Sequence, residues 1–559
     1  ADDTWKIRRN VTLELGLRWS LLYTPFNPDN QATSFEPWLY DPSKPNTDAC
    51  NGLWTVPGTD PCGAANAQFG TNFSKAADAP NKYLVNQNHH QFAPRIGIAW
   101  DPWGDGNWAI RLGVGQFFQR ERVSGPYYSI TNNAPFVINA SATKALGDPT
   151  PASLSGSASP SGGRSPDSLS PNSWQWNFSV EHSFAKDTVL QIGYVGNVGE
   201  HLTSNYDINQ VSSTATGNCT YGGVDYGTQP LATCAAFLNA NSTPNVNTLR
   251  PYSNFGQLAY WTHQGHASYN ALQVLFKSRY KRSQVTGSYT WSHSIANVLL
   301  DNSDGGVGIS SFTDITRPYL DRGNSAINRP NIFVANFTYF LPDLNNSNGA
   351  VRAVLGGWET AAIVSEMNGN SQTMPQAGIS ENGANLVAGA VNGSALAAQI
   401  GTGGLYNMLR PLVTGQSCTA GRNGENLYNA QAFTMIGQVI GQYMSNSEPH
   451  GYCEGPGINN IDFSVDKNWK LTERLHMQFR MDFFNLFNHA NFVGNTGSNT
   501  PIGGATINCG PADNNGKYQP CSPINNVITN QSYVNNFGQA AQTNTRSGRE
   551  LQYTLKFTF

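Results

Sequence analysis

The eight cysteines are the residues of this sequence with the most definite chemistry. They fall as four sequence neighbours, and each pair lies within one long polar segment. An even number placed in this way predicts four local disulfides in an oxidising compartment, each removing about 3 kcal/mol of loop entropy from the disordered chain. Metal binding is the alternative, but the sequence has no CxxC spacing and only His450 lies close to one of these cysteines. The expected pairs are Cys50–Cys62, Cys219–Cys234, Cys418–Cys453 and Cys509–Cys521.

Two other short segments contain residue types that bind metals. His89 and His90 are adjacent in "NQNHHQF", but neighbouring side chains of an extended segment point to opposite sides, so a shared metal is not expected. Asp301, Asn302 and Asp304 in "DNSDGG" have the oxygen-rich composition of a calcium loop. The closing Glu of the EF-hand spacing is missing, and a polar turn is the interpretation we favour. We therefore expect neither a metal nor a cofactor.

Catalytic motifs are absent from the sequence. It contains no GxxxxGK[ST] phosphate loop, no HExxH motif and no GxSxG elbow, so we expect no enzyme activity. A net charge of −3 with 12% charged residues also argues against a nucleic-acid partner. Aromatic residues in the polar segments could stack on a sugar or a peptide, or could pack the loops against one another. They include Tyr127, Tyr128, Tyr260 and Trp261.

The elements that would position these residues are strands with alternating apolar and polar side chains. The final segment, "RELQYTLKFTF", places five apolar residues on one face, because successive side chains of a strand point to opposite sides. The same pattern recurs in "VTLELGLRWSL", "WQWNFSVEH" and "LHMQFRMDF". Such strands fit either a soluble sandwich or a barrel standing in lipid.

Loop lengths distinguish these two folds. Short links such as "DPWGDGN" and "KRS" alternate with long segments, one of which, "PTPASLSGSASPSGGRSPDSLSP", we expect to be a surface loop between two strands. Short turns at one rim and long loops at the other are typical of outer-membrane barrels, with the turns in the periplasm and the loops outside the cell. Thirteen strands are expected, near 1–7, 10–22, 92–101, 107–119, 173–184, 188–198, 268–280, 284–296, 329–340, 356–368, 459–469, 474–488 and 549–559.

The composition also fits a membrane barrel. No apolar run approaches the roughly 18 to 20 residues of a membrane-spanning helix. A mean hydropathy of −0.40 is compatible with a barrel, whose lipid-facing residues alternate with residues that line a wet interior. The sequence therefore predicts an all-β, transmembrane antiparallel barrel in the bacterial outer membrane, crossing it many times. The charges expected to face the interior are Glu14, Arg18, Arg95, Arg111, Lys277, Arg279, Asp462, Asp466, Arg480, Asp482 and Lys556.

Several segments resemble one family, the Oar-like branch of the TonB-dependent outer-membrane receptors. They include "DDTWKIRRNVTLELGLRW", "FAPRIGIAWDPWGDGNWAIRLGVGQFF", "GPGINNIDFSVDKNWKLTERLHMQFRMDFFNLFNHANF" and the closing strand. The resemblance implies a barrel of about 22 strands in outer-membrane lipid, filled by an N-terminal plug whose periplasmic box is pulled by TonB to import a scarce or bulky extracellular solute. It also implies that the closing strand is the signal read by the barrel-assembly machinery. The residues of that assembly signal are Tyr553, Leu555, Phe557 and Phe559.

The sequence departs from this family in one respect, because nothing in it resembles the plug or the TonB box. Thirteen strands would also enter and leave the membrane in the same direction, whereas antiparallel closure needs an even number. We therefore expect residues 1–559 to be the C-terminal part of the barrel, with the plug and about nine strands lying upstream of Ala1. The expected function is energised import. A passive porin and a surface barrel used for structure or adhesion are the alternatives, and the sequence does not reveal the solute.

Overall fold

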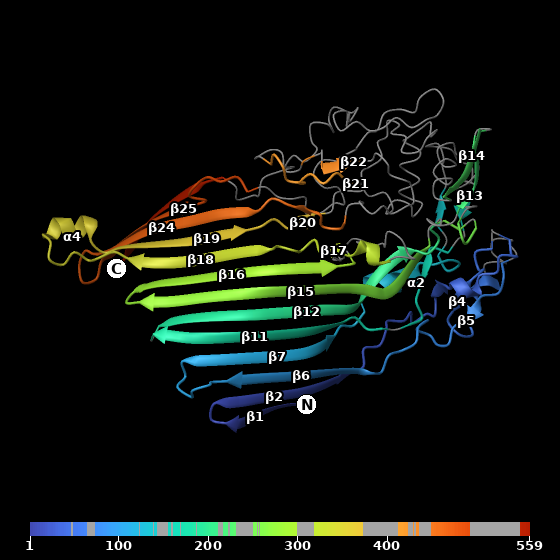
Figure 1. The fold of residues 1–559 in the computed structure, drawn as a ribbon, viewed down its shortest axis with the longest axis horizontal. Helices are drawn as coiled ribbons and strands as arrows, with labels where there is room; N and C mark the ends of the chain where they lie inside the picture. Colours follow the sequence, from blue (N-terminus) through green and yellow to red (C-terminus); the bar gives the residue numbers. More distant parts are fainter. Residues whose placement is uncertain are drawn as a thin grey trace.

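The structure is a computed structural model, and most of its regular elements belong to one long sheet with short connections at one end and long connections at the other (Figure 1). No helix in the described part of the chain is long and apolar enough to cross a membrane. The described residues are 1–45, 48–63, 73–121, 123–137, 139–141, 155–157, 160–167, 169–185, 187–210, 216–221, 224–230, 250–253, 255–256, 258–298, 318–372, 412–422, 429, 432–434, 449–491 and 548–559.

Thirteen strands form the main path of the sheet, in sequence order and with antiparallel neighbours. They correspond one to one to the strands expected from the alternation of residues, which confirms that prediction. Two strands are longer than expected, because β12 and β15 continue beyond residues 198 and 268 as a paired extension with irregular register. The strands are β1 (Asp2–Arg8), β2 (Val11–Ser20), β6 (Gln91–Trp100), β7 (Trp108–Phe118), β11 (Asn172–Ala185), β12 (Thr188–Asp207), β15 (Ala259–Tyr280), β16 (Ser283–Ala296), β18 (Asn331–Phe340), β19 (Trp358–Met367), β24 (Ile458–Lys470), β25 (His476–Phe484) and β26 (Glu550–Thr558).

One face of the sheet is apolar and exposed. Directly opposite residues of neighbouring strands share a face, and the register joins Phe178 to Tyr194 and Tyr194 to Leu272 on this face. Leu15 and Leu17, which a soluble sandwich would place in a closed core, are 46% and 50% exposed. An apolar face of this extent is stable in lipid and unstable in water, so the soluble sandwich is excluded. Other exposed residues on this face are Trp19, Ile98, Phe276, Trp291, Phe337 and Phe557.

The opposite face is polar and charged. Arg111 and Glu181 form an ion pair of 2.8 Å between β7 and β11. On β25, Gln478 donates to the Asp466 carboxylate of β24 at 2.8 Å. The alternation of each strand also places the other charges expected to face the interior on this side of the sheet. The two predicted faces are therefore confirmed.

The outermost strands of the sheet are β1 and β26. Within the described residues, β1 pairs only with β2, and β26 pairs only with β25. Each therefore presents one edge whose backbone N–H and C=O groups have no partner strand in that part of the chain.

The rim with short connections includes α4 (Gly349–Leu355), which Asn348 caps at its N-terminus. Its last carbonyls accept hydrogen bonds from side chains on the apolar face, namely the indole N–H groups of Trp358 and Trp469 and the ammonium of Lys467. Lys467 is 2% exposed, and its ammonium lies 5.1 and 5.2 Å from the centres of the two indole rings. A charge is thus tolerated at an apolar-face position because carbonyl oxygens and aromatic rings surround it.

The rim with long connections carries short elements. They are β3 (Thr33–Phe35), η1 (Pro37–Leu39), β4 (Leu53–Thr55), β5 (Ala77–Asp78), η2 (Val123–Tyr127), α2 (Tyr128–Thr131), β8 (Asn139–Ser141), β9 (Ser155–Ser157), β10 (Gly162–Arg164), β13 (Thr216–Tyr221), β14 (Val224–Pro230), η4 (Pro318–Asp321), β17 (Gly323–Asn324), β20 (Ser371–Gln372), β21 (Leu412–Val413), β22 (Phe433–Thr434) and β23 (Cys453–Glu454). Of these, β4, β5, β13 and β14 extend well beyond the sheet on the right of Figure 1.

Candidate functional site

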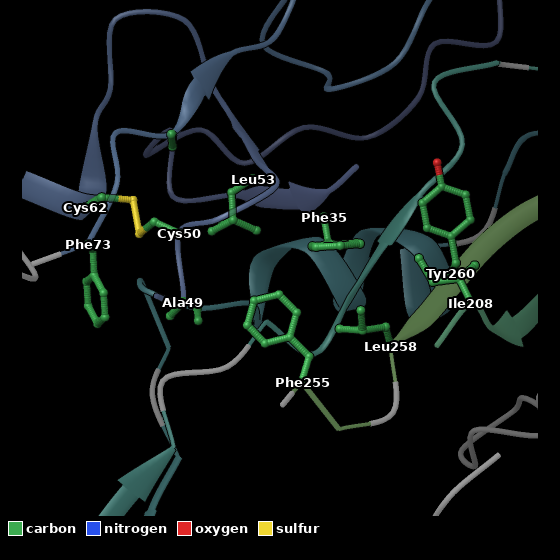
Figure 2. Close-up of a cluster of buried hydrophobic side chains, with 12 residues drawn as sticks. Phe35, Ala49, Cys50, Leu53, Cys62, Phe73, Ile208, Phe255, Leu258 and Tyr260 are labelled. Carbon is green, nitrogen blue, oxygen red and sulfur yellow. A yellow bond between two sulfur atoms is a disulfide. The ribbon is translucent and has the colours of Figure 1, made fainter. Parts of the chain in front are cut away.

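Long connections from β2 to β15 pack into one body, which we call the mouth layer: the described residues of 21–90, 119–137, 160–171, 204–210 and 250–262. Figure 2 shows its apolar centre, which includes Phe35 and Phe255. The Phe35 ring packs edge-on against the rings of Phe255 and Tyr252, with centroids 5.9 and 4.9 Å away. Leu53 and Leu258 are buried in the same cluster. An apolar core thus lies in the loops, because one face of the sheet is exposed to lipid and the other is polar.

In the described part of the chain, disulfides brace the long connections at two places. Cys50 is bonded to Cys62 beside the apolar centre of the mouth layer, and Cys418 is bonded to Cys453 in the connection between β19 and β24. Both bonds join the sequence neighbours that were expected. The pairs Cys219–Cys234 and Cys509–Cys521 involve residues that lie outside the described part of the chain, so their bonding stays a prediction.

The low-complexity segment connects two strands, β7 and β11, as expected, but its described residues Gly162–Arg164 are buried, which corrects the prediction that it lies on the surface. β10 (Gly162–Arg164) contacts β3 and pairs in parallel with β15. A side chain on Gly162 would meet the carbonyl of Ala259, and one on Gly163 would meet the carbonyl of Phe35, so glycine is needed where these backbones approach. The small residues that make the segment look unstructured are the residues that allow this packing.

Arg164 brings a charge into the mouth layer with 1% of its surface exposed. Its Nη2 donates to both carboxylate oxygens of Glu121, at 3.0 and 2.8 Å, and Nε2 of His263 lies 3.3 Å from one of them. Burial disfavours the charge of Glu121, but Arg164 and His263 outweigh it, so the pKa of Glu121 is lowered. Nδ1 of His263 is buried and has no hydrogen-bond partner in the part of the chain that the structure describes.

Glu36 is a second buried acid of the mouth layer. It accepts hydrogen bonds from the Ser34 hydroxyl at 2.8 Å and from the Tyr260 hydroxyl at 3.0 Å. Burial raises the pKa of Glu36 to about 8, although these hydrogen bonds and the nearby Arg164 act in the opposite direction. The carboxyl group is therefore mostly protonated at neutral pH.

The aromatic residues weighed as ligand contacts have different surroundings. Tyr260 is 6% exposed, so it packs the loops together through its contact with Glu36. Trp261 is half-buried on β15. Tyr128 is exposed, so its ring is accessible from outside the mouth layer.

The residues weighed as metal ligands do not form a metal site where the structure describes them. The ring of His89 lies edge-on to the ring of Tyr23 with centroids 5.9 Å apart, and His90 is exposed. No group of three or more metal-binding side chains occurs among the described residues. Asp301, Asn302 and Asp304 lie outside them.

The residues of the expected assembly signal lie on β26 and just after it. Tyr553, Leu555 and Phe557 are exposed on the apolar face, and Phe559 follows the strand and is 97% exposed. Their positions are those that the alternation predicts, and their role in assembly stays a prediction.

A pocket of about 650 Å³ lies beside η4 and the outer end of β16, where the paired extension of β12 and β15 begins. Its walls include His201, His263, His266 and Arg322, and its floor includes Val198 and Ile295. The sequence analysis did not single out these residues. The available signal was "HQGH" (263–266), where histidines appear at the point at which the alternation of β15 breaks down.

The exposed apolar face, the polar face and the uneven rims together define a membrane-spanning β-barrel protein. Residues 1–552 match the family described as "Outer membrane beta barrel domain", so the chain belongs to that family, and its location is the bacterial outer membrane. A search of curated proteins found no match.

Three solved structures are similar to this chain over most of its length. The outer membrane transporter YddB from Escherichia coli has 10% identity and a TM-score of 0.38, with 84% of this chain and 41% of that chain covered. The siderophore receptor PirA from Acinetobacter baumannii has 9% identity and a TM-score of 0.37, with 100% and 44% covered. The ferric yersiniabactin uptake receptor FyuA from Yersinia pestis has 8% identity and a TM-score of 0.33, with 89% and 42% covered. This chain thus spans less than half the length of each of them, and at these scores the likeness carries no information about a substrate.

Proposed function

We propose that this chain forms part of the barrel of an energised outer-membrane importer that takes up a bulky or scarce solute with energy from TonB. The observation that carries the proposal is the size and polarity of the sheet. A barrel of about eight strands is filled by its own side chains, whereas wider barrels enclose a channel or a plug. Thirteen strands with a charged inner face therefore belong to a wide, wet lumen.

Neither β1 nor β26 has a second partner strand among the described residues, and this supports a larger barrel. An unpaired strand edge in lipid leaves each backbone N–H and C=O group unsatisfied, at a cost of several kcal/mol per group. We propose that strands outside this sheet pair with both edges, and that a plug belonging to the same receptor occupies the lumen. The resemblance to the Oar-like TonB-dependent receptors supports this part of the proposal, as does the assembly signal on β26, which we propose is read by the barrel-assembly machinery.

One observation favours a second candidate function. The mouth layer has its own apolar core and a disulfide, so it is a rigid surface body as well as a set of loops. A barrel that serves as an anchor for a structural or adhesive surface would also have such a layer.

Two measurements on the full-length receptor distinguish the candidates. An importer should bind the purified periplasmic domain of TonB and should show no KCl conductance in a planar bilayer, because its plug closes the lumen. An open KCl conductance without TonB binding would establish a porin, and the absence of both would establish a surface anchor. Either of these results would refute the importer.

A further inference from the structure

The pocket beside the outer end of β16 has residues of the apolar face of the sheet in its lining. Its floor residues are aligned across the strands, with Val198 opposite Ser268 and Ser268 opposite Ile295. Four residues further down the same strands lie Tyr194, Leu272 and Trp291, which are exposed on the apolar face. An even spacing along a strand keeps side chains on one face, so the floor of the pocket faces outward as well.

The pocket also lies at the end of the apolar band. Trp174, on the neighbouring strand, is directly opposite Val198, and Trp291 lies four residues below Ile295 on its own strand. Tryptophans of membrane barrels concentrate at the lipid headgroups, so the pocket is at the level of the outer leaflet's headgroups. It therefore lies outside the polar lumen through which a solute would pass.

One wall of the pocket supplies a buried nitrogen without a hydrogen-bond partner among the described residues. It is Nδ1 of His263, whose side chain is 6% exposed. His201 interacts electrostatically with His263, His266 and Glu200, which places the three imidazoles close together. Because an unpaired buried nitrogen is costly, a ligand atom that bonds to it would be stabilised.

Charge at the rim of the pocket selects the kind of head group. Arg322 is exposed on the lining and carries a positive charge, and the described residues that line the pocket include no acidic side chain. Glu121, behind His263, is already paired with Arg164. A guanidinium beside imidazole donors fits phosphate oxygens, and the floor of Val198 and Ile295 fits hydrocarbon.

We propose that this pocket binds the phosphate-bearing head group of an outer-leaflet glycolipid. The phosphate contacts Arg322 and the imidazoles of His266 and His263, and the first carbons of the acyl chains lie over Val198 and Ile295. The site requires only the location of the chain in the outer membrane and is independent of import, because it faces away from the lumen.

The test measures lipid binding to the full-length receptor in detergent by native mass spectrometry. The probes are a purified rough lipopolysaccharide, the same lipopolysaccharide after enzymatic dephosphorylation, and inorganic phosphate. The wild type should bind the phosphorylated form at least about tenfold more tightly than the dephosphorylated form, and Arg322→Ala combined with His266→Ala should remove that preference. Arg352→Ala, which removes an exposed positive charge from the opposite rim, is the matched control and should bind as the wild type does.

A second variant tests the floor without changing charge. Ile295→Trp fills the pocket and should weaken binding of the phosphorylated lipid while leaving the shift in gel mobility on heating, which reports a folded barrel, unchanged. Equal binding of both lipopolysaccharide forms, or wild-type binding by the Arg322/His266 variant, would refute the proposal. Full displacement of the lipid by inorganic phosphate would also refute it, because the site would then recognise a free anion.

Discussion

Replacing Glu36 by Gln tests whether the mouth layer depends on a protonated carboxyl group. Glu36 is fully buried, and its two oxygens accept hydrogen bonds from Ser34 and Tyr260. Glutamine has nearly the same shape and keeps a carbonyl acceptor, but it cannot ionise. The substitution therefore isolates the effect of the charge from the effect of the packing.

The size of the effect follows from the pKa of Glu36, which burial raises from 4.5 to about 8. The folded mouth layer binds this proton more tightly than the unfolded one, so the stability that the carboxyl group contributes is complete below pH 4.5 and is lost as the pH rises through 8. A difference of about 3.5 units corresponds to about 5 kcal/mol over the whole window, of which about 3 kcal/mol is already lost at pH 7. Above pH 8 this contribution changes no further.

Hydrogen exchange of the mouth layer is the measurement that checks this prediction. The backbone N–H of Arg164 donates to the Ser34 hydroxyl at 3.0 Å, so its protection reports directly on the surroundings of Glu36. After correction for intrinsic exchange, protection in the wild type should fall between pH 5 and pH 8, and in Glu36→Gln it should stay constant. Asp29→Asn, an exposed carboxylate in the same connection, is the control and should follow the wild type. If the wild type shows no slope, or if Glu36→Gln shows the same slope, Glu36 is not a buried neutral acid.

Three further predictions concern other parts of the molecule. Replacing Cys50 and Cys62 by Ser should destabilise the mouth layer by about 3 kcal/mol, which limited proteolysis should detect as faster cleavage in 21–90 while the barrel stays folded. Arg164→Met leaves the Glu121 carboxylate buried without the guanidinium and should lower the stability of the mouth layer by about 3 to 5 kcal/mol. Combining it with Glu121→Leu should recover most of that loss, and hydrogen exchange measures the stability of both variants. If the effects of the two substitutions simply add, the ion pair is contradicted. Phe559→Ala should slow insertion into the outer membrane, which is measured as a smaller amount of heat-modifiable protein after a pulse of synthesis. Lys556→Gln, on the polar face of β26, is the control and should have little effect. Equal insertion of the two variants would argue against an assembly signal.

The sheet could be predicted from the sequence because its determinants are local. In segments such as "VTLELGLRWSL", the alternation of side chains fixes both the strand and the face that meets lipid. Prediction failed where the strands stop alternating. The paired extension of β12 and β15 contains His201, with a positive φ of 54°, and irregular register, so no period-two pattern marks it.

The mouth layer could be predicted only in part. The disulfide between Cys50 and Cys62 could be predicted, because two cysteines close together in one connection can reach each other. Arg250 and Asp207 form a buried ion pair of 3.1 Å. Nothing in the sequence predicts this pair, because arginine and aspartate are usually exposed on a protein surface. The pocket could not be predicted from the sequence either, because its lining comes from three strands and η4, whose alignment depends on the register of the whole sheet.

The contacts that hold the mouth layer together are far apart in the sequence. Glu36 and Tyr260 are separated by 224 residues, and Ser34 and Arg164 by 130. Contacts between residues this far apart in the sequence form late in folding, because the chain between the two residues must first be brought into place. The intervening chain contains β6, β7, β11 and β12, so these strands must be aligned with β15 before the mouth layer can close. The folded mouth layer therefore reports that the strands from β6 to β15 have been aligned, and an antibody specific for the folded layer would detect receptors in which this part of the barrel has been assembled.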